Sequence, residues 1–286
     1  MSPGTLFVVA TPIGNLEDVS PRALHVLGRV SLVACEDTRR TAQILERFGL
    51  TVSTVSCHKF NERARLGELL DRVQAGEDVA LVSDGGTPGV SDPGRHLVEA
   101  ALDAGLPVSP IPGPSAVATL LSASGLPADR FVFEGFLPAR PGERRRRLRA
   151  LRTESRTLVL FEAPHRLLDT LQDLAAILGE RRIVLGRELT KIHETVLRGS
   201  ARELADMLAT GPVRGEITLA LEGAAAAEAA APDEADAAAL RRAWAAALSA
   251  SGGDRRDALR RAARELGMGR AELWRRLGEL GEDTGR

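Results

Sequence analysis

The feature that most constrains the fold is the segment 83–94, which follows the apolar run Val79-Ala80-Leu81-Val82. It reads Ser-Asp-Gly-Gly-Thr-Pro-Gly-Val-Ser-Asp-Pro-Gly, and so many glycines and prolines can extend neither a strand nor a helix. The backbone must therefore turn directly after a strand and present its own N–H groups there. Open α/β sheets bind their ligands at the carboxyl ends of the strands, so this segment predicts a binding loop.

Two further segments have the same pattern of an apolar strand followed by a turn. Residues 6–10 lead into Thr-Pro-Ile-Gly-Asn at 11–15, and residues 108–111 lead into Pro-Gly-Pro-Ser-Ala at 112–116. In all three segments we expect a strand that ends in a loop.

Strand and helix patterns alternate up to about residue 222, which predicts an α/β fold with a mainly parallel sheet. We expect an N-terminal α/β domain at 1–113, a second α/β domain at 114–223, an alanine-rich linker at 224–232 and a helical extension at 233–286. Helices are predicted at 38–48, 62–75, 93–104, 117–124, 166–178 and 201–209, and in the extension at 254–266 and 270–280. The last two, joined by Gly267-Met268-Gly269, predict a helix-turn-helix.

Composition excludes several classes of protein. With 44% hydrophobic and 27% charged residues in 286, the chain is typical of a soluble globular protein, and a net charge of −1 excludes a globally basic surface. Only Cys35 and Cys57 are present, outside any C-x-x-C pair, which predicts a reduced cytoplasmic protein without structural zinc. No segment indicates export or a membrane span, and the histidines show no ligand spacing, so no metal site is expected.

Charge is concentrated in an arm at residues 140–156, where eight arginines face Glu143 and Glu154, a net of 8 − 2 = +6. One interpretation is a mobile lid that grips RNA phosphates through Arg144, Arg145, Arg146, Arg147 and Arg149; the other is a solvated helix face. In the extension, eleven arginines face ten acidic residues from Asp233 onward. The extension could contact RNA or support a dimer, or it could be a solvated helical cap; the sequence leaves both interpretations open.

The expected ligand is not an ordinary nucleotide. The chain has no G-x-x-x-x-G-K-[ST], and its first strand does not open into G-x-G-x-x-G. Asp84 instead lies among glycines, with apolar Ile13, Val90 and Ala116 able to border it. A carboxylate with apolar walls suits a ligand that carries hydroxyls, an amine and a flat ring, such as S-adenosylmethionine.

Seven motifs in order resemble the bacterial small-subunit ribosomal RNA 2′-O-ribose cytidine methyltransferases, which belong to the tetrapyrrole methylase (class III) superfamily. They are 9–18, 36–39 (Glu-Asp-Thr-Arg), 61–62 (Asn-Glu), 83–94, 112–116, 161–166 and 186–191. The resemblance spans about residues 5–223, and the tail resembles that family's helix-turn-helix extension. It implies a cofactor cleft between two α/β domains, a homodimer, and a cytidine ribose of the 16S rRNA decoding region, within the 30S subunit, as substrate.

The resemblance also assigns cofactor contacts to residues of these motifs. They are Ile13, Asp84, Thr87, Ser115, Ala116 and Phe161, together with Glu216 and Ile217 in the last predicted strand. For Phe161 and Ile217, packing in the core is an equal alternative.

Charged residues after two strands are the catalytic candidates. Lys191 could lower the proton affinity of a ribose hydroxyl or hold a phosphate, Glu188 could accept the proton or orient Lys191, and Arg187 adds charge beside them. Asp37 is expected to place the substrate, with helix capping as its alternative, while a structural ion pair is the alternative for Glu188 and Lys191.

RNA contacts are expected from Arg39, His58 and Asn61, although a lone histidine more often satisfies a loop hydrogen bond. Two competing functions remain: a methyltransferase for a tetrapyrrole or corrin precursor, which gains nothing from the +6 arm, and a non-catalytic RNA-binding module.

Overall fold

The structure, a computed structural model, describes residues 2–209, 211–225 and 234–282. The chain divides into two compact units, Met1–Ala225 and Ala226–Arg286. Most of the predicted alanine-rich linker at 224–232 lies outside the described residues. Among the helices of the described ranges, none is long and apolar enough to cross a membrane.

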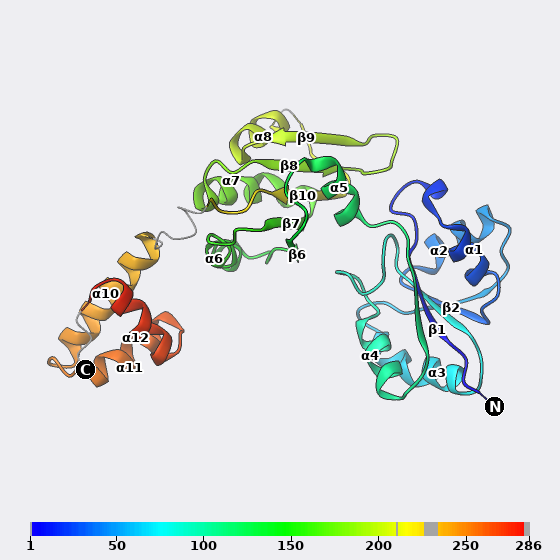
Figure 1. Cartoon of the computed structure of the whole chain (residues 1–286), viewed down its shortest axis with the longest axis horizontal. Helices are drawn as coiled ribbons and strands as arrows, with labels where there is room; N and C mark the ends of the chain where they lie inside the picture. The colour runs from blue at the N-terminus through cyan, green and yellow to red at the C-terminus, as the bar shows by residue number, and fades with distance from the viewer. Residues whose placement is uncertain (1, 210, 226–233, 283–286) are drawn as a thin grey trace. The chain divides into compact units, whose positions relative to one another are not determined.

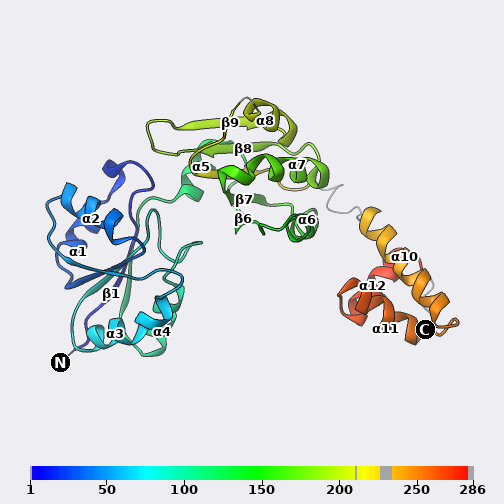
Figure 2. The same ribbon diagram turned by 180° about the vertical axis from the view of Figure 1, so that it is seen from behind.

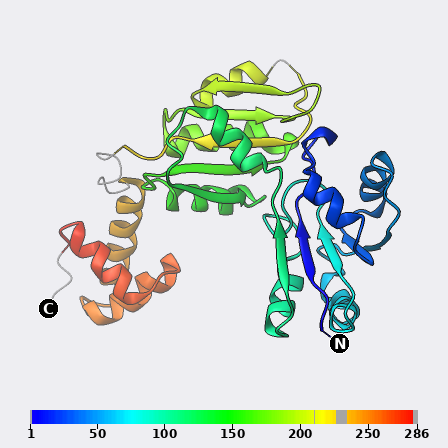
Figure 3. The same cartoon turned by 45° about the vertical axis from the view of Figure 1, so that its right-hand side comes forward.

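The first unit contains two five-stranded sheets, and the first sheet is entirely parallel. Its strands lie in the order β3-β2-β4-β1-β5, and their arrowheads point the same way in Figure 3. The strands are β1 (Leu6–Val9), β2 (Leu32–Cys35), β3 (Ser53–Ser56), β4 (Val79–Val82) and β5 (Val108–Ile111). The predicted parallel sheet is thus present, with a polar edge strand, β3, that sequence patterning did not indicate.

Helices cover both faces of this sheet (Figure 1). They are α1 (Pro21–Leu27), α2 (Thr38–Arg47), α3 (Glu62–Gln74) and α4 (Arg95–Asp103). Leu69 and Val73 of α3 pack with Leu97 of α4 on one face, whereas Ala23 and Leu27 of α1 pack on the other. The central strands β2 and β4 are buried throughout, which explains their unbroken apolar sequences.

The second sheet is mixed and has the order β6-β7-β10-β8-β9. Its strands are β6 (Phe131–Phe136), β7 (Thr157–Glu162), β8 (Ile183–Arg187), β9 (Thr195–Gly199) and β10 (Ile217–Leu221). β6 and β7 are parallel, but β10 runs antiparallel to both β7 and β8. The edge strand β9, which pairs antiparallel with β8, is a second strand that the sequence did not indicate.

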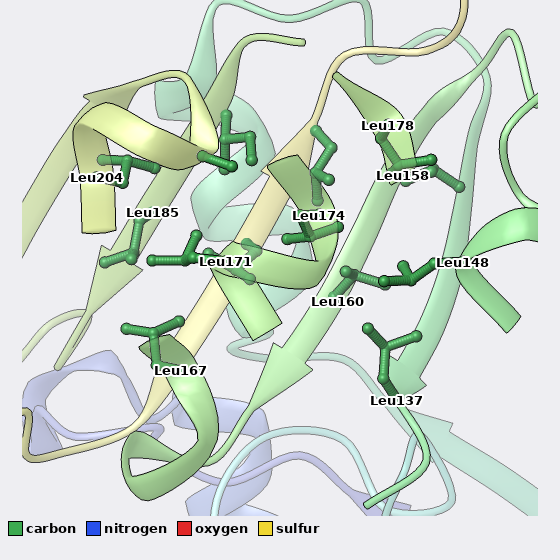
Figure 4. Packing of buried hydrophobic residues seen from close by; sticks show 14 of the residues in the cluster. Leu137, Leu148, Leu158, Leu160, Leu167, Leu171, Leu174, Leu178, Leu185 and Leu204 are labelled. Atoms are coloured by element: carbon green, nitrogen blue, oxygen red, sulfur yellow. The ribbon is translucent and has the colours of Figure 1, made fainter. Parts of the chain in front are cut away.

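The core of the second sheet explains the leucine-rich helices around it. One face is covered by α6 (Pro141–Ala150), α7 (Leu167–Leu178) and α8 (Ala201–Leu208), as the view from behind shows (Figure 2). Leu167, Leu171 and Leu174 of α7 meet Leu160 and Leu185 of the strands in Figure 4. α5 (Ala116–Ser124) covers the opposite face through a smaller cluster.

The described part of the second unit, residues 234–282, is a bundle of three helices with its own core. These are α10 (Glu234–Ala250), α11 (Arg255–Leu266) and α12 (Arg270–Glu279). Trp244 of α10, Ala262 of α11 and Leu273 of α12 are among its buried residues. The predicted pair of helices around Gly267-Met268-Gly269 is therefore present as α11 and α12, with α10 as a third helix packed against them.

Candidate active site

Loops from the parallel sheet meet at its carboxyl edge, as the sequence predicted. Thr11, just after β1, forms an isolated bridge with Gly86, in which each backbone N–H donates to the other's carbonyl at 2.9 Å. The Thr11 hydroxyl also donates to the Ser83 carbonyl at 3.1 Å. An added Cβ at Gly86, which has φ +89°, would lie 3.4 Å from Ile13 Cγ2, so the glycine lets the loop pack on Ile13. The predicted binding loop is thus fixed to the loop that follows β1.

Asp84 and Asp37 lie together in this edge. Asp84 Oδ1 accepts the backbone N–H of Asp37 at 2.9 Å, and Arg40 lies 3.5 Å from the other oxygen. Asp37 caps α2, because its side chain accepts the N–H of Arg39 at 2.9 Å and pairs with the Arg39 guanidinium. The capping alternative for Asp37 is therefore realised in the structure.

Two further carboxylates lie at this edge: Glu36, which begins the Glu-Asp-Thr-Arg motif, and Asp92, which was not among the residues predicted for the site. Burial, and next the charge of Asp84, raise the pKa of Glu36. Burial and the charge of Glu36 raise the pKa of Asp92 to about 6, with further contributions from Asp84 and Glu216. The edge therefore holds more negative charge than it neutralises, which favours a cationic ligand. The repeated Asp in Ser-Asp-x-x-x-Pro-Gly-x-Ser-Asp was the one available signal for Asp92.

Glu62 holds the end of the binding loop in place. Its buried carboxylate accepts the backbone N–H groups of Gly94, His96 and Leu97 at 2.9 to 3.1 Å, which occupies free donors at the start of α4. Its neighbour Asn61 accepts the N–H of His58 at 2.7 Å. The Asn-Glu motif thus shapes the loop before α3 and supports the one before α4.

The second sheet contributes a cation after β8, Lys191, which is held between two carboxylates. Lys191 Nζ lies 2.9 Å from Glu188 Oε1 and 3.3 Å from Glu216 Oε2, and the backbone N–H of Glu216 donates to Glu188 at 2.9 Å. Glu188 and Thr190 adopt φ values of +54° and +67°, unusual for residues other than glycine. Strain of this kind is frequent at functional sites.

These contacts fix the protonation states of the pair. The hydrogen bond from Lys191, followed by the Glu216 backbone N–H, lowers the pKa of Glu188. Burial alone would lower the pKa of Lys191, but its hydrogen bond to Glu188 and the charge of Glu216 outweigh this and raise it. Lys191 is therefore a firmly held cation and Glu188 a weak base.

The loop after β1 is in contact with the loop that carries Lys191. The Asn15 backbone N–H donates to Thr190 Oγ1 at 3.1 Å, and a Cβ at Gly14 would overlap the Lys191 side chain. In addition, a Cβ at Gly135 of β6 would lie 2.6 Å from Ser91 Oγ in the binding loop. The structure thus brings Ile13 and Asp84 into one neighbourhood with Glu188, Lys191 and Glu216.

The other predicted cofactor residues have mixed surroundings. Ser115 and Ala116 begin α5, Thr87 is half-buried in the binding loop, and Phe161 packs edge-to-face on Phe133 with ring centroids 4.9 Å apart. Ile217 is only 3% exposed and belongs to the leucine cluster of Figure 4. Its side chain has the packing role that the sequence left open as an equal alternative. Arg187, at the end of β8, donates to Thr195 Oγ1 at 3.3 Å.

The arginine arm forms a helix, as the second of its two interpretations expected. It is not a lid, because residues 141–150 form α6, anchored on the second sheet by buried Leu148. Arg144 is 3% exposed and pairs with Asp173 at 2.7 Å, so its guanidinium is closed to a phosphate; this corrects its expected RNA contact. Arg145 shares Asp173, and Arg147 pairs with Glu134.

Arg146 and Arg149 remain exposed on α6, and neither has an ion pair within the described part of the chain. Over the same described ranges, no group of three or more histidine, cysteine, aspartate or glutamate side chains has the arrangement of a metal site.

Comparisons with known proteins agree with this geometry. The pattern of the tetrapyrrole (corrin/porphyrin) methylases matches residues 5–205. The "Ribosomal RNA small subunit methyltransferase I" of Pseudomonas aeruginosa is 53% identical over 78% of this chain and 80% of its own length. The protein of that name from Escherichia coli O157:H7 is 49% identical over 78% of this chain and 79% of its own.

Solved structures share the fold at lower identity. The methyltransferase CobJ aligns with a TM-score of 0.60 at 22% identity, over 78% of this chain and 95% of its own. Uroporphyrin-III C-methyltransferase from Thermus thermophilus, complexed with S-adenosyl homocysteine, aligns with a TM-score of 0.55 at 21% identity, over 77% and 97%. The chain therefore belongs to the tetrapyrrole methylase family, in its branch of ribosomal RNA small subunit methyltransferases I.

Proposed function

We propose that this protein is an S-adenosylmethionine-dependent methyltransferase that methylates the 2′-hydroxyl of a cytidine in the decoding region of 16S rRNA. The observation that carries the proposal is the contact between the loop after β1, at the sheet edge that holds Asp84, and the loop after β8, where two carboxylates hold the cation Lys191. Relatives between 45% and 53% identical that are named for the small-subunit RNA support the substrate class.

The residues present fit the cofactor. Asp84, Asp92 and Glu36 supply three carboxylates that Arg40 neutralises only in part, which suits the sulfonium and ammonium groups of S-adenosylmethionine. The binding loop also approaches the loop after β1 closely at Gly85, where an added Cβ would lie 3.2 Å from the Pro12 carbonyl oxygen. Asp84 would hold a polar end of the cofactor, and Ile13, Thr87, Ser115 and Ala116 would line it. Bound S-adenosylmethionine supplies an electrophilic methyl group.

The chain's own residues would then prepare the acceptor hydroxyl. A protonated Lys191 can stabilise the negative charge that develops on the ribose oxygen or bind the adjacent phosphate. Glu188 and Glu216 fix the position of its ammonium group. Orientation is the larger contribution, because well-placed reactants gain about 7–11 kcal/mol over free encounter. Glu188 then orients Lys191, and the proton that the ribose hydroxyl loses passes to water as its oxygen takes the methyl group and S-adenosylhomocysteine leaves.

RNA would be held by cations outside the reacting group. Arg39 is exposed beside Asp37, and Arg146 and Arg149 are exposed on α6. Each can neutralise a backbone phosphate. We further infer a homodimer that acts on the 30S subunit, which places the enzyme in the cytoplasm where subunits assemble.

The experiment is methyl transfer from radiolabelled S-adenosylmethionine to three acceptors: 30S subunits lacking the modification, free 16S RNA, and a porphyrinoid. Label in 30S or 16S RNA supports the proposal and identifies the acting form of the substrate. Label only in the porphyrinoid would move the chain to corrin chemistry, and cofactor binding without any transfer would reject both.

A further inference from the structure

Phe60 is an aromatic side chain left almost wholly in solvent. It is 93% exposed, in a chain with only 3% aromatic residues. A phenylalanine ring usually gains about 2 kcal/mol or more by burial, so a ring that touches only the edge of His58, with ring centroids 6.1 Å apart, keeps most of that free energy available for a partner.

The loop that carries Phe60 is held by hydrogen bonds. The Phe60 backbone N–H donates to His58 Nδ1 at 3.2 Å, and the His58 N–H donates to Asn61 Oδ1 at 2.7 Å. The Asn61 amide also donates to the Ser56 carbonyl at 3.2 Å. The ring is therefore presented from a fixed turn and loses little conformational entropy when it binds a partner.

Phe60 lies at the same sheet edge as the acidic site. β3 and β2 pair in parallel up to Cys35 and Ser56, and the Cys57 N–H donates to the Cys35 carbonyl at 2.7 Å, so the loops after the two strands leave side by side. His58, in the loop after β3, lies near Glu36, in the loop after β2. The loop that carries the ring therefore runs beside the loop that leads into α2, whose first turn carries Arg39 and Arg40.

Exposed cations also lie at this edge of the sheet. Lys59 is exposed and precedes the ring in the chain, and the side chains of Arg39 and Arg40, paired with Asp37 and Asp84, are 88% and 59% exposed. A single ring among cations does not match the apolar face that a second protein copy would offer. It does match single-stranded RNA, whose bases stack on aromatic rings while nearby cations neutralise the phosphates.

We propose that Phe60 stacks on an unpaired RNA base next to the target nucleotide and positions the acceptor ribose at the sheet edge. This inference rests on the proposed function, because it takes the substrate to be RNA. Lys59, Arg39 and Arg40 then contact the flanking phosphates. Phe60 does not touch the reacting atoms and acts as a substrate-positioning residue.

The test compares full-length wild type with Phe60→Ala, Phe60→Trp and Phe131→Ala. Phe131 is a matched control, since it is 42% exposed but starts β6 in the other sheet. We expect Phe60→Ala to weaken binding of unmodified 30S subunits or 16S RNA roughly 5- to 150-fold and to raise KM in parallel. Affinity for S-adenosylmethionine stays unchanged, Phe60→Trp restores RNA binding, and Phe131→Ala behaves as wild type.

Filter binding of RNA and size-exclusion light scattering accompany the kinetics. Unchanged RNA binding by Phe60→Ala would overturn the inference, as would a change from dimer to monomer, which would assign the ring to a subunit interface. If the wild type transfers no methyl group but Phe60→Ala still lowers RNA binding, the proposed reaction fails while the stacking role stands.

Discussion

Replacing Asp92 by asparagine should stabilise the fold at neutral pH. Asp92 has a pKa of about 6 in the folded chain, against 3.8 for an unhindered aspartate, because burial and Glu36 oppose its charge. Because the folded pKa lies above the unfolded one, the charged form costs the fold stability. The cost is absent below about pH 4, grows between pH 4 and 6, and is complete above pH 6.

The magnitude follows from the two pKa values. A difference of about two pH units corresponds to about 3 kcal/mol, and we expect about 1 to 3 kcal/mol because Asp92 retains some contact with water. The carboxamide oxygen introduced by the substitution can still accept the hydrogen bond from Ser83. Asp92→Asn should therefore raise the free energy of unfolding at pH 7.5 and leave it unchanged at pH 4.

Urea unfolding at pH 7.5 and pH 4 measures the difference in the free energy of unfolding between Asp92→Asn and wild type. Far-UV circular dichroism is the suitable probe, because Trp244 and Trp274 both lie in the C-terminal unit and their fluorescence does not report on this sheet. A variant less stable than wild type at pH 7.5, or equally stabilised at both pH values, would refute the reasoning. The same variant should bind S-adenosylmethionine more weakly, since a negative charge next to a cationic ligand has been removed.

Three further predictions concern the site and the arm. Lys191→Met should lower kcat about 10²- to 10³-fold while calorimetry finds cofactor affinity unchanged, and a joint loss of both would contradict its assignment to the acceptor side. Asp84→Asn should weaken cofactor binding roughly 10- to 100-fold in the same titration, and unchanged affinity would remove Asp84 from the site. Arg144→Leu should lower the free energy of unfolding by about 3 kcal/mol, because it leaves Asp173 buried without that partner. The double variant Arg146→Ala, Arg149→Ala should leave the free energy of unfolding unchanged and lower the salt dependence of RNA binding. Equal losses of stability in the two variants would contradict the difference in burial.

The parts of the fold that sequence could predict are those set by local apolar runs. Local sequence predicts the buried strands β2 and β4 from their apolar runs, and the turns after β1, β4 and β5 from their glycines and prolines. β3 could not be found this way, because Ser53-Thr54-Val55-Ser56 is a polar edge strand with no buried residue. β9 is an edge strand of the same kind. The antiparallel course of β10 depends on pairing across the sheet and leaves no local trace.

The limits of the site prediction have the same physical origin. Arg144 and Arg146 are two residues apart in one arginine run. Arg144 is buried and pairs with Asp173 of another helix, whereas Arg146 is exposed to solvent. The raised pKa of Asp92 depends on carboxylates from other loops, and Ile217 faces leucines of a helix that precedes it by about forty residues. Motif order located the neighbourhood of the site, but tertiary contacts decide which side chains face a ligand.

The most direct test of the central claim is the chemical position of the transferred methyl group. We would methylate 30S subunits that lack the modification, digest the RNA to nucleosides, and identify the product by mass spectrometry beside 2′-O-methylcytidine and base-methylated cytidine standards. The account predicts 2′-O-methylcytidine from the decoding region, with the yield lost in Lys191→Met. A methyl group on the base, or on a ribose outside that region, would contradict it.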